Sequence, residues 1–228
     1  MAVAPALSGR TLSDIRTPPG IKARAGKLLA RPLFWTALVG VAVSVAVSLA
    51  ARHLRPPALR TLGSVPDFHL LDQRSLAFGT EQLRGKVWVA GFIFTRCPTV
   101  CPKLTRCMGE LQAQTQGFGQ RFHMVSFTVD PEGDTPSVLS EYAKKYGANQ
   151  RTWSFLTGTT DDVRRTVVSG MKIAMGREGP RDNPNSIFHG TKLALIDSRM
   201  AIRGYYECEN DAEKQQLVSD IAHLVHGE

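Results

Sequence analysis

The sequence predicts an α/β domain, with a central mixed sheet flanked by helices, that follows an N-terminal transmembrane helix. Three observations support this prediction. Residues 33–51 form an uncharged apolar run, and segments with strand and helix patterns alternate from residue 65 onward. A buried strand pattern also runs directly into two cysteines that open a helix, and a hairpin and a helix close the chain. Together these features are typical of a thioredoxin-like fold.

The positive charge of the chain lies before the predicted domain. The formal net charge of the 228 residues is +8, and residues 1–60 hold nine Lys or Arg and one acid, whereas residues 61–228 hold 19 of each sign. A basic tail on a neutral domain indicates a membrane flank, and we expect no nucleic-acid partner. Residues 1–32 show no apolar period, which predicts a disordered cytoplasmic tail.

Residues 33–51, LFWTALVGVAVSVAVSLAA, have the length of a membrane anchor. A bilayer core of ~30 Å needs about 20 apolar residues in a helix. Six Lys or Arg precede the run and three follow it, which predicts a cytoplasmic N-terminus. We therefore expect a single-pass protein of the inner (cytoplasmic) membrane with its soluble domain on the periplasmic side. A cleaved signal peptide is the alternative, because AVSLAA offers small residues for cleavage.

Residues 52–64 are predicted to be a linker and residues 65–228 the thioredoxin-like domain. Apolar residues alternate around DQRS within residues 66–83, which predicts a hairpin. KVWVAGFIF, residues 86–94, is apolar nearly throughout, as is typical of a strand covered on both faces. A helix from Pro98 to about Gln116 is expected next.

The second half of the domain continues the alternation. Thr135 as N-cap and Pro136 at the first helical position predict a helix that stops at Gly147. The other expected elements are a strand at 121–130, a short helix at 159–171, paired strands at 192–197 and 200–207, and an amphipathic helix at 211–226.

Cys97 and Cys101, in FIFTRCPTVCP, fall where the first buried strand ends and a helix begins. Unpaired N–H groups and the helix dipole favour the thiolate there, and the thiolate is both the reactive and the metal-binding form. Residues four apart share one helix face, so the sulfurs can converge on one ion or oxidise to a disulfide. A purely stabilising disulfide is a further reading, although so short a loop removes little chain entropy.

His189 is the predicted third ligand of a metal site. It lies in SIFHGTKLALID, and in a thioredoxin-like fold the loop before this strand approaches the cysteine helix. Two thiolates and one imidazole suit Cu(I), and they hold Cu(II) with a further weak ligand. Zinc usually needs a fourth ligand or a water. The remaining histidines are interpreted as linker, structural or helix-terminal residues: His53, His69, His123, His223 and His226.

TRCPTVCPKL, TVDPEGDTP and the His189 segment resemble the Sco/SenC family of membrane-anchored copper chaperones, over roughly residues 62–226. The resemblance implies binding of copper, as Cu(I) and/or Cu(II), by Cys97, Cys101 and His189. It also implies delivery to the dinuclear copper site of cytochrome c oxidase, with the copper-site subunit as partner. The acidic motif of the family falls on Asp130 and Asp134. The first Asp either tunes the site or contacts a partner, or it is only a turn and capping acid.

Other functions remain open. The alternative is a thiol–disulfide oxidoreductase that reduces the client's copper-ligand cysteines, with Cys97 and Cys101 as its catalytic redox pair. SIFHGTK lacks the proline that such oxidoreductases commonly place there, which favours metal binding, and we expect a binding protein rather than an enzyme. A peroxidase is a weaker third reading, with Arg96 as a lone cation. Cys107 and Cys208 lie outside the motif, either bonded to each other or, for Cys107, buried in helix packing.

Overall fold

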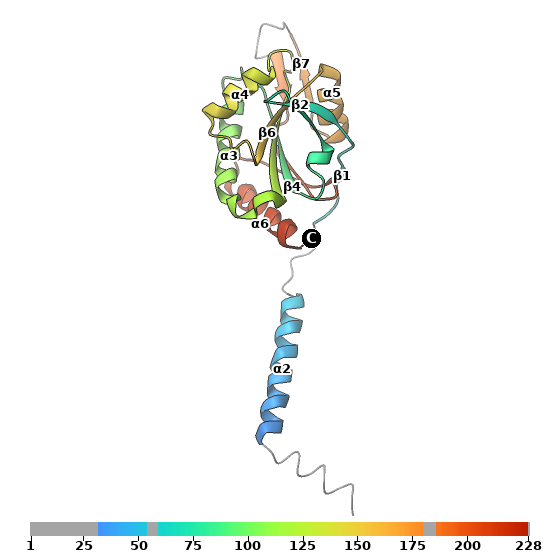
Figure 1. Cartoon of the computed structure of the whole chain (residues 1–228), viewed down its shortest axis with the longest axis vertical. Coiled ribbons are helices and arrows are strands. Elements are labelled where there is room, and N and C mark those ends of the chain that lie inside the picture. The colour runs from blue at the N-terminus through green and yellow to red at the C-terminus, as the bar shows by residue number, and fades with distance from the viewer. Residues whose placement is uncertain (1–31, 54–58, 180–185, 228) are drawn as a thin grey trace, which may run out of the picture. The chain divides into compact units, whose positions relative to one another are not determined.

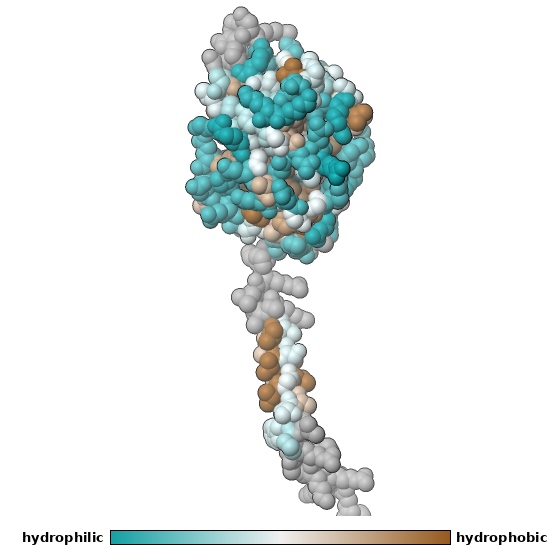
Figure 2. All heavy atoms as spheres, turned by 60° about the vertical axis from the view of Figure 1, so that its left-hand side comes forward, coloured by the Kyte–Doolittle hydropathy of each residue, from teal (hydrophilic) through white to brown (hydrophobic). Residues whose placement is uncertain are grey.

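The computed structural model describes residues 32–53, 59–179 and 186–227, so the predicted tail at 1–32 lies outside the described residues except for Pro32, which begins a helix. The chain divides into two compact units, Met1–Pro57 and Ala58–Glu228. In the first unit, helix α2 (Pro32–His53) covers the predicted anchor (Figure 1), and its large apolar side chains between Phe34 and Leu49 are exposed (Figure 2). Within the described ranges, no helix combines the length and the apolarity needed to cross a membrane.

The second unit is built on an eight-stranded mixed sheet with the order β1-β10-β9-β4-β5-β6-β2-β3 (Figure 1). Its centre is formed by three parallel strands, β4 (Val87–Ile93), β5 (Phe122–Thr128) and β6 (Trp153–Thr157), and every residue of these strands is buried. The outer strands pair antiparallel: β1 (Gly63–Ser64), β2 (His69–Asp72), β3 (Ala77–Gly79), β9 (Leu193–Ile196) and β10 (Ala201–Tyr206). Full burial explains why β4 is apolar without alternation.

Helices cover both faces of this sheet. Figure 1 shows α3, α4 and α6 on one side and α5 on the other. The helical segments are α3 (Val100–Gln114), α4 (Pro136–Lys145), α5 (Thr160–Arg164), α6 (Asp211–Gly227), the 3₁₀ turns η1 (Thr80–Gln82) and η2 (Gln116–Arg121), and the π-helical turn η3 (Arg165–Gly170). The arrangement is the predicted mixed sheet flanked by helices.

A separate two-stranded sheet carries the histidine segment. Strand β7 (Met175–Arg177) pairs antiparallel with β8 (Ile187–His189), and Met175 lies opposite His189. Neither strand was predicted, because three residues are too few to carry a readable period. The short strands β1, β6, β7 and β8 are additions to the predicted order, and β1 falls inside the predicted linker.

Local signals set several boundaries as predicted. The Thr135 side chain accepts a hydrogen bond from the Val138 N–H at the start of α4, with Pro136 at the first helical position, and Gly147 has a φ of +67° just beyond its end. Most other predicted elements end within one or two residues of the observed ones, and two differences concern the helices. Helix α3 begins at Val100, so Cys97 precedes it, and the predicted helix at 159–171 changes from α-helical to π-helical at Arg165.

His123 shows the cost of burying a titratable group in this core. It lies on β5, its ring stacks on that of Phe78 with centroids 5.9 Å apart, and its Nε2 is 3.0 Å from Ser154 Oγ. Burial, reinforced by the nearby charge of Lys86, lowers its pKa to about 4. The prediction that His123 is a satisfied structural histidine is confirmed.

Acidification is therefore expected to destabilise the domain through His123. In the unfolded chain the imidazole takes up a proton near pH 6.5, whereas in the fold it does so only near pH 4. The contribution of the neutral ring is complete above pH 6.5 and is lost as the pH falls toward 4, with a loss of about 3 kcal/mol. Urea unfolding of wild type and His123→Gln at pH 7 and pH 4 measures it. Equal losses of stability in both proteins would contradict this assignment.

Candidate metal centre

The two motif cysteines lie at the junction between β4 and α3. Cys97 is half-buried in the loop before the helix, and Cys101 is fully buried in its first turn. Both are free thiols. The Cys101 N–H points at the Cys97 sulfur at 3.4 Å, and the Phe94 N–H points at the Cys101 sulfur at 3.4 Å. Each sulfur thus receives a backbone donor of the kind that stabilises a thiolate.

The two thiols differ in acidity. Burial works against ionisation of Cys97, but backbone N–H groups of Cys101, Thr99 and Val100 outweigh it and lower the pKa of Cys97. Burial raises the pKa of Cys101 strongly, and the neighbouring Cys97 reinforces this effect. Cys97 is therefore the thiol that ionises first.

This difference predicts unequal reactivity. With iodoacetamide at neutral pH, Cys97 is expected to be labelled well before Cys101, because Cys97 is accessible and more acidic whereas Cys101 is buried. Limited labelling followed by peptide mass spectrometry measures the order. In Cys97→Ser, Cys101 is expected to stay unlabelled over the same period. Labelling of both thiols at one rate would show that the asymmetry is absent.

His189 approaches the buried cysteine from β8. Its Nε2 lies 3.4 Å from Cys101 Sγ, and its Nδ1 lies 3.0 Å from the Gly190 carbonyl oxygen. A carbonyl only accepts, so Nδ1 carries the proton and Nε2 keeps its lone pair facing the sulfur. Burial lowers the pKa of His189, against a smaller opposing effect of the hydrogen bond to Gly190. A neutral imidazole with a free Nε2 is the form that binds metals.

The three predicted ligands lie close together, but their side chains are not arranged as a complete metal-binding site. Cys97 and His189 line one pocket of about 260 Å³, together with Phe94 and Phe188, and the Phe94 ring meets the His189 ring edge-on at 5.8 Å. Among the described residues, no three His, Cys, Asp or Glu side chains are already arranged to hold an ion. Binding by all three would require side-chain adjustment, and their role as ligands stays a prediction.

The two acids of the second motif hold the cysteine loop. Asp134 is fully buried and accepts hydrogen bonds from the N–H and Oγ1 of Thr95, at 3.1 and 2.6 Å, and from Thr128 Oγ1 at 2.6 Å. Asp130 is also buried and pairs with Arg96 at 2.6 Å and with Arg177 at 2.9 Å. Arg96 is thus not the lone cation that the sequence suggested. Arg177 was missed, because nothing in MGREGP marks it.

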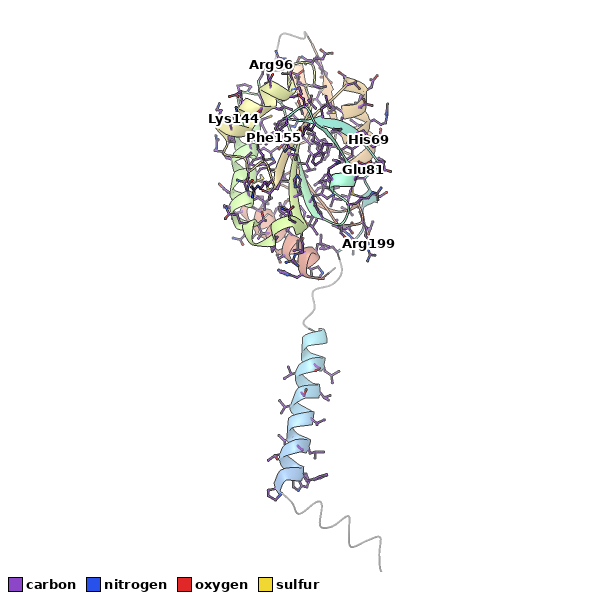
Figure 3. All side chains as sticks on the ribbon, viewed as in Figure 1. His69, Glu81, Arg96, Lys144, Phe155 and Arg199 are labelled. Atoms are coloured by element: carbon purple, nitrogen blue, oxygen red, sulfur yellow. A yellow bond between two sulfur atoms is a disulfide. The ribbon has the colours of Figure 1, made fainter. Side chains whose placement is uncertain are left out.

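Among the histidines whose side chains the structure describes, His189 alone lines the pocket at this centre. His69 is exposed on β2, with its Nδ1 3.8 Å from Glu81 Oε1, and Figure 3 labels the two residues on the same side of the domain. His69 is interpreted from the sequence as a satisfied structural histidine, but 75% of its side chain is exposed, so that interpretation does not hold. His226, near the end of α6, meets the Phe118 ring edge-on. The side chain of His53 lies outside the described residues.

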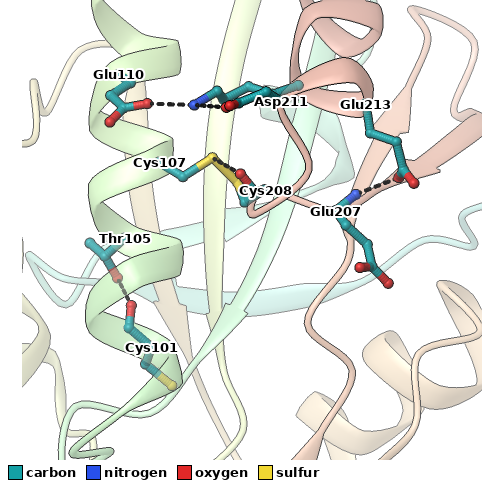
Figure 4. The surroundings of a disulfide bond; sticks show 9 residues. Cys101, Thr105, Cys107, Glu110, Glu207, Cys208, Asp211 and Glu213 are labelled. Atoms are coloured by element: carbon teal, nitrogen blue, oxygen red, sulfur yellow. Dashed lines mark hydrogen bonds and ion pairs between the residues drawn. A yellow bond between two sulfur atoms is a disulfide. The ribbon is translucent and has the colours of Figure 1, made fainter.

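Cys107 and Cys208 form a disulfide, the first of the two readings that the sequence left open (Figure 4). It joins α3 to the turn between β10 and α6 across 101 residues of sequence. Cys107 is also buried against the core, so both readings hold for that residue. The pairing was not predictable from sequence, because the two residues share no motif.

Comparisons with known proteins place this fold and motif in a known group. A family model described as SCO1/SenC matches residues 59–226. A SCO1 protein homolog of Bacillus subtilis is 28% identical over 158 residues, which is 69% of this chain and 80% of the relative.

Two solved structures extend the comparison. BsSco, described as a member of the Sco family of cytochrome c oxidase assembly proteins in which a disulfide switch was identified, has a TM-score of 0.65 at 26% identity, over 75% of this chain and 99% of that one. ScoI of Bradyrhizobium japonicum with copper bound has a TM-score of 0.61 at 19% identity, over 71% and 99%. At 19% identity, the similarity to ScoI shows a shared fold and nothing more.

Proposed function

Because the chain belongs to the SCO1/SenC family, we propose that it binds copper and delivers it to the dinuclear copper site of cytochrome c oxidase during assembly. One observation carries the proposal. The unprotonated Nε2 of His189 lies 3.4 Å from Cys101 Sγ, and Cys97, the other thiol of the motif, lines the same pocket as His189. The description of BsSco as a member of the Sco family of cytochrome c oxidase assembly proteins supports the proposal.

The donor chemistry fits copper as cargo. Two thiolates and one imidazole are soft ligands in low number, a set that suits Cu(I). Cys97 ionises readily and supplies the first thiolate, and Cys101 loses its proton when the metal replaces it. The copper-site subunit would take the ion by stepwise exchange of these sulfurs for its own. Oxidation of Cys97 and Cys101 to a disulfide would remove two ligands and stop loading.

The alternative function is reduction of the client's copper-ligand cysteines. The unequal thiols favour this candidate, because Cys97 is an accessible, acidified nucleophile and Cys101 is a buried partner four residues away. Cys97 would attack a client disulfide, and Cys101 would then displace the client thiol and leave a Cys97–Cys101 disulfide. The client gains the two electrons that this pair loses.

A transfer experiment separates the two functions. Protein loaded with Cu(I) is mixed with copper-site subunit whose cysteines are already reduced, and copper is followed on each protein after separation. Delivery predicts that copper arrives in the subunit from wild type and not from His189→Ala. The oxidoreductase alternative predicts no transfer, but reduction of oxidised subunit by wild type and by His189→Ala alike.

We further propose that residues 33–51 attach the domain to the inner membrane, that residues 52–64 act as a linker and that the domain lies on the periplasmic side. The uncharged run and the excess of Lys and Arg before it support this topology. Carbonate extraction of membranes and protease treatment of spheroplasts test it. Protein that is extracted by carbonate, or a domain that resists protease in intact spheroplasts, would contradict it.

A further inference from the structure

The candidate ligands come from two segments that no common sheet holds together. Cys97 and Cys101 follow β4 of the eight-stranded sheet, whereas His189 ends β8 of the separate two-stranded sheet. In the described part of the chain, β7 and β8 pair only with each other. Something other than strand pairing must therefore set the position of His189 relative to the cysteine loop.

A buried carboxylate connects the two segments. Asp130 follows β5 with 2% of its surface exposed, and each of its oxygens receives one guanidinium. Oδ2 lies 2.6 Å from Nη2 of Arg96, the residue before Cys97. Oδ1 lies 2.9 Å from Nη2 of Arg177, which stands opposite Ile187 in the β7–β8 pair. Charge-assisted bonds of this kind are both strong and directional.

The surrounding chain is shaped around this contact. A Cβ atom on Gly133 would lie 2.6 Å from Asp130 Oδ2 and 3.0 Å from Arg96 Nη2, so any residue larger than glycine would have to displace the pair. Arg177 is also held by Ser186, whose Oγ is 3.3 Å from its Nη1 at the start of the segment that carries His189. The Arg177 guanidinium thus contacts both Asp130, just after β5, and Ser186, just before β8.

We propose that the Arg96–Asp130–Arg177 bridge positions the cysteine loop and the histidine strand relative to each other. None of the three side chains is a predicted ligand, so each acts as a positioning residue. The bridge limits the movement needed to bring His189 Nε2 and both sulfurs onto one ion. This role rests on the proposed function at the same site, and it goes beyond the alternatives of tuning and capping that the sequence offered for Asp130.

Two variants break the bridge with little change of shape, Asp130→Asn and Arg177→Gln. A matched control is Arg203→Gln, which removes the partner of the equally buried Asp197 in the β9–β10 hairpin. Three quantities are measured on the full chain: Cu(I) affinity by chelator competition, amide exchange of the β7–β8 pair without added metal, and stability in urea. The exchange measurement reports positioning whether or not copper binds.

The bridge predicts that both variants bind Cu(I) about 10- to 100-fold more weakly than wild type. It also predicts that β8 amides exchange at least about tenfold faster, beyond any change in global stability. Arg203→Gln is expected to alter stability alone. Unchanged β8 exchange in Arg177→Gln would overturn the inference, as would copper affinity equal to that of wild type in both variants. Wild type that binds no copper would instead overturn the proposed function. The amide-exchange result would still show whether the bridge positions the β7–β8 pair.

Discussion

Replacing His189 by alanine is expected to weaken Cu(I) binding by more than about 100-fold, because the change removes a ligand, and loss of a residue that merely orients a ligand already costs 10- to 100-fold. The free Nε2 at 3.4 Å from Cys101 Sγ is the physical basis of this expectation. Competition with a chromophoric Cu(I) chelator, under anaerobic and reducing conditions, measures the change.

His69→Ala is the matched control, since it deletes an exposed imidazole that pairs only loosely with Glu81. It is expected to bind Cu(I) as wild type does. Urea unfolding of both variants separates ligand loss from loss of the fold. If His189→Ala is folded and binds Cu(I) with wild-type affinity, His189 is not a ligand of the site.

Removing the Cys107–Cys208 disulfide is expected to have the largest effect on stability. The bond closes a loop with a sequence separation of 101 residues, and losing a cross-link of this kind costs about 3–5 kcal/mol through the entropy of the unfolded chain. The double variant Cys107→Ala, Cys208→Ala leaves no stray thiol, and its free energy of unfolding in guanidinium chloride is compared with that of wild type.

Copper binding at 25 °C serves as the control for this double variant, because neither cysteine is among the predicted ligands. Its affinity is expected to stay unchanged while stability falls. An unchanged unfolding midpoint would mean that the bond does not constrain the unfolded chain, and loss of copper binding in folded protein would tie the disulfide to the site.

The parts of the fold that were predictable have strong local chemistry. The strand predicted at 86–94 is apolar nearly throughout because both of its faces are covered, and the helix after Thr135 has a cap, a proline and a terminating glycine. The short strand β6 and the paired β7 and β8 were not predictable. Their residues are ordered by neighbouring strands, and such tertiary pairing leaves no period in three to five residues.

The candidate site divides in the same way. Cys97, Cys101 and His189 were found from the motif, the ligand chemistry and the expected layout of the fold. The tautomer of His189 was not predictable, because the Nδ1 contact with the Gly190 carbonyl oxygen depends on a local backbone geometry. Arg177 could not be found either, since its importance arises only where β5 and β7 meet in space.

X-ray absorption at the copper edge, on full-length reduced protein titrated with Cu(I), tests the central claim most directly. The proposed site predicts one copper ion per chain, with two sulfur ligands and one imidazole nitrogen, and loss of the imidazole signal in His189→Ala. Absence of bound copper, or a wild-type spectrum with sulfur ligands alone, would contradict a site built from Cys97, Cys101 and His189.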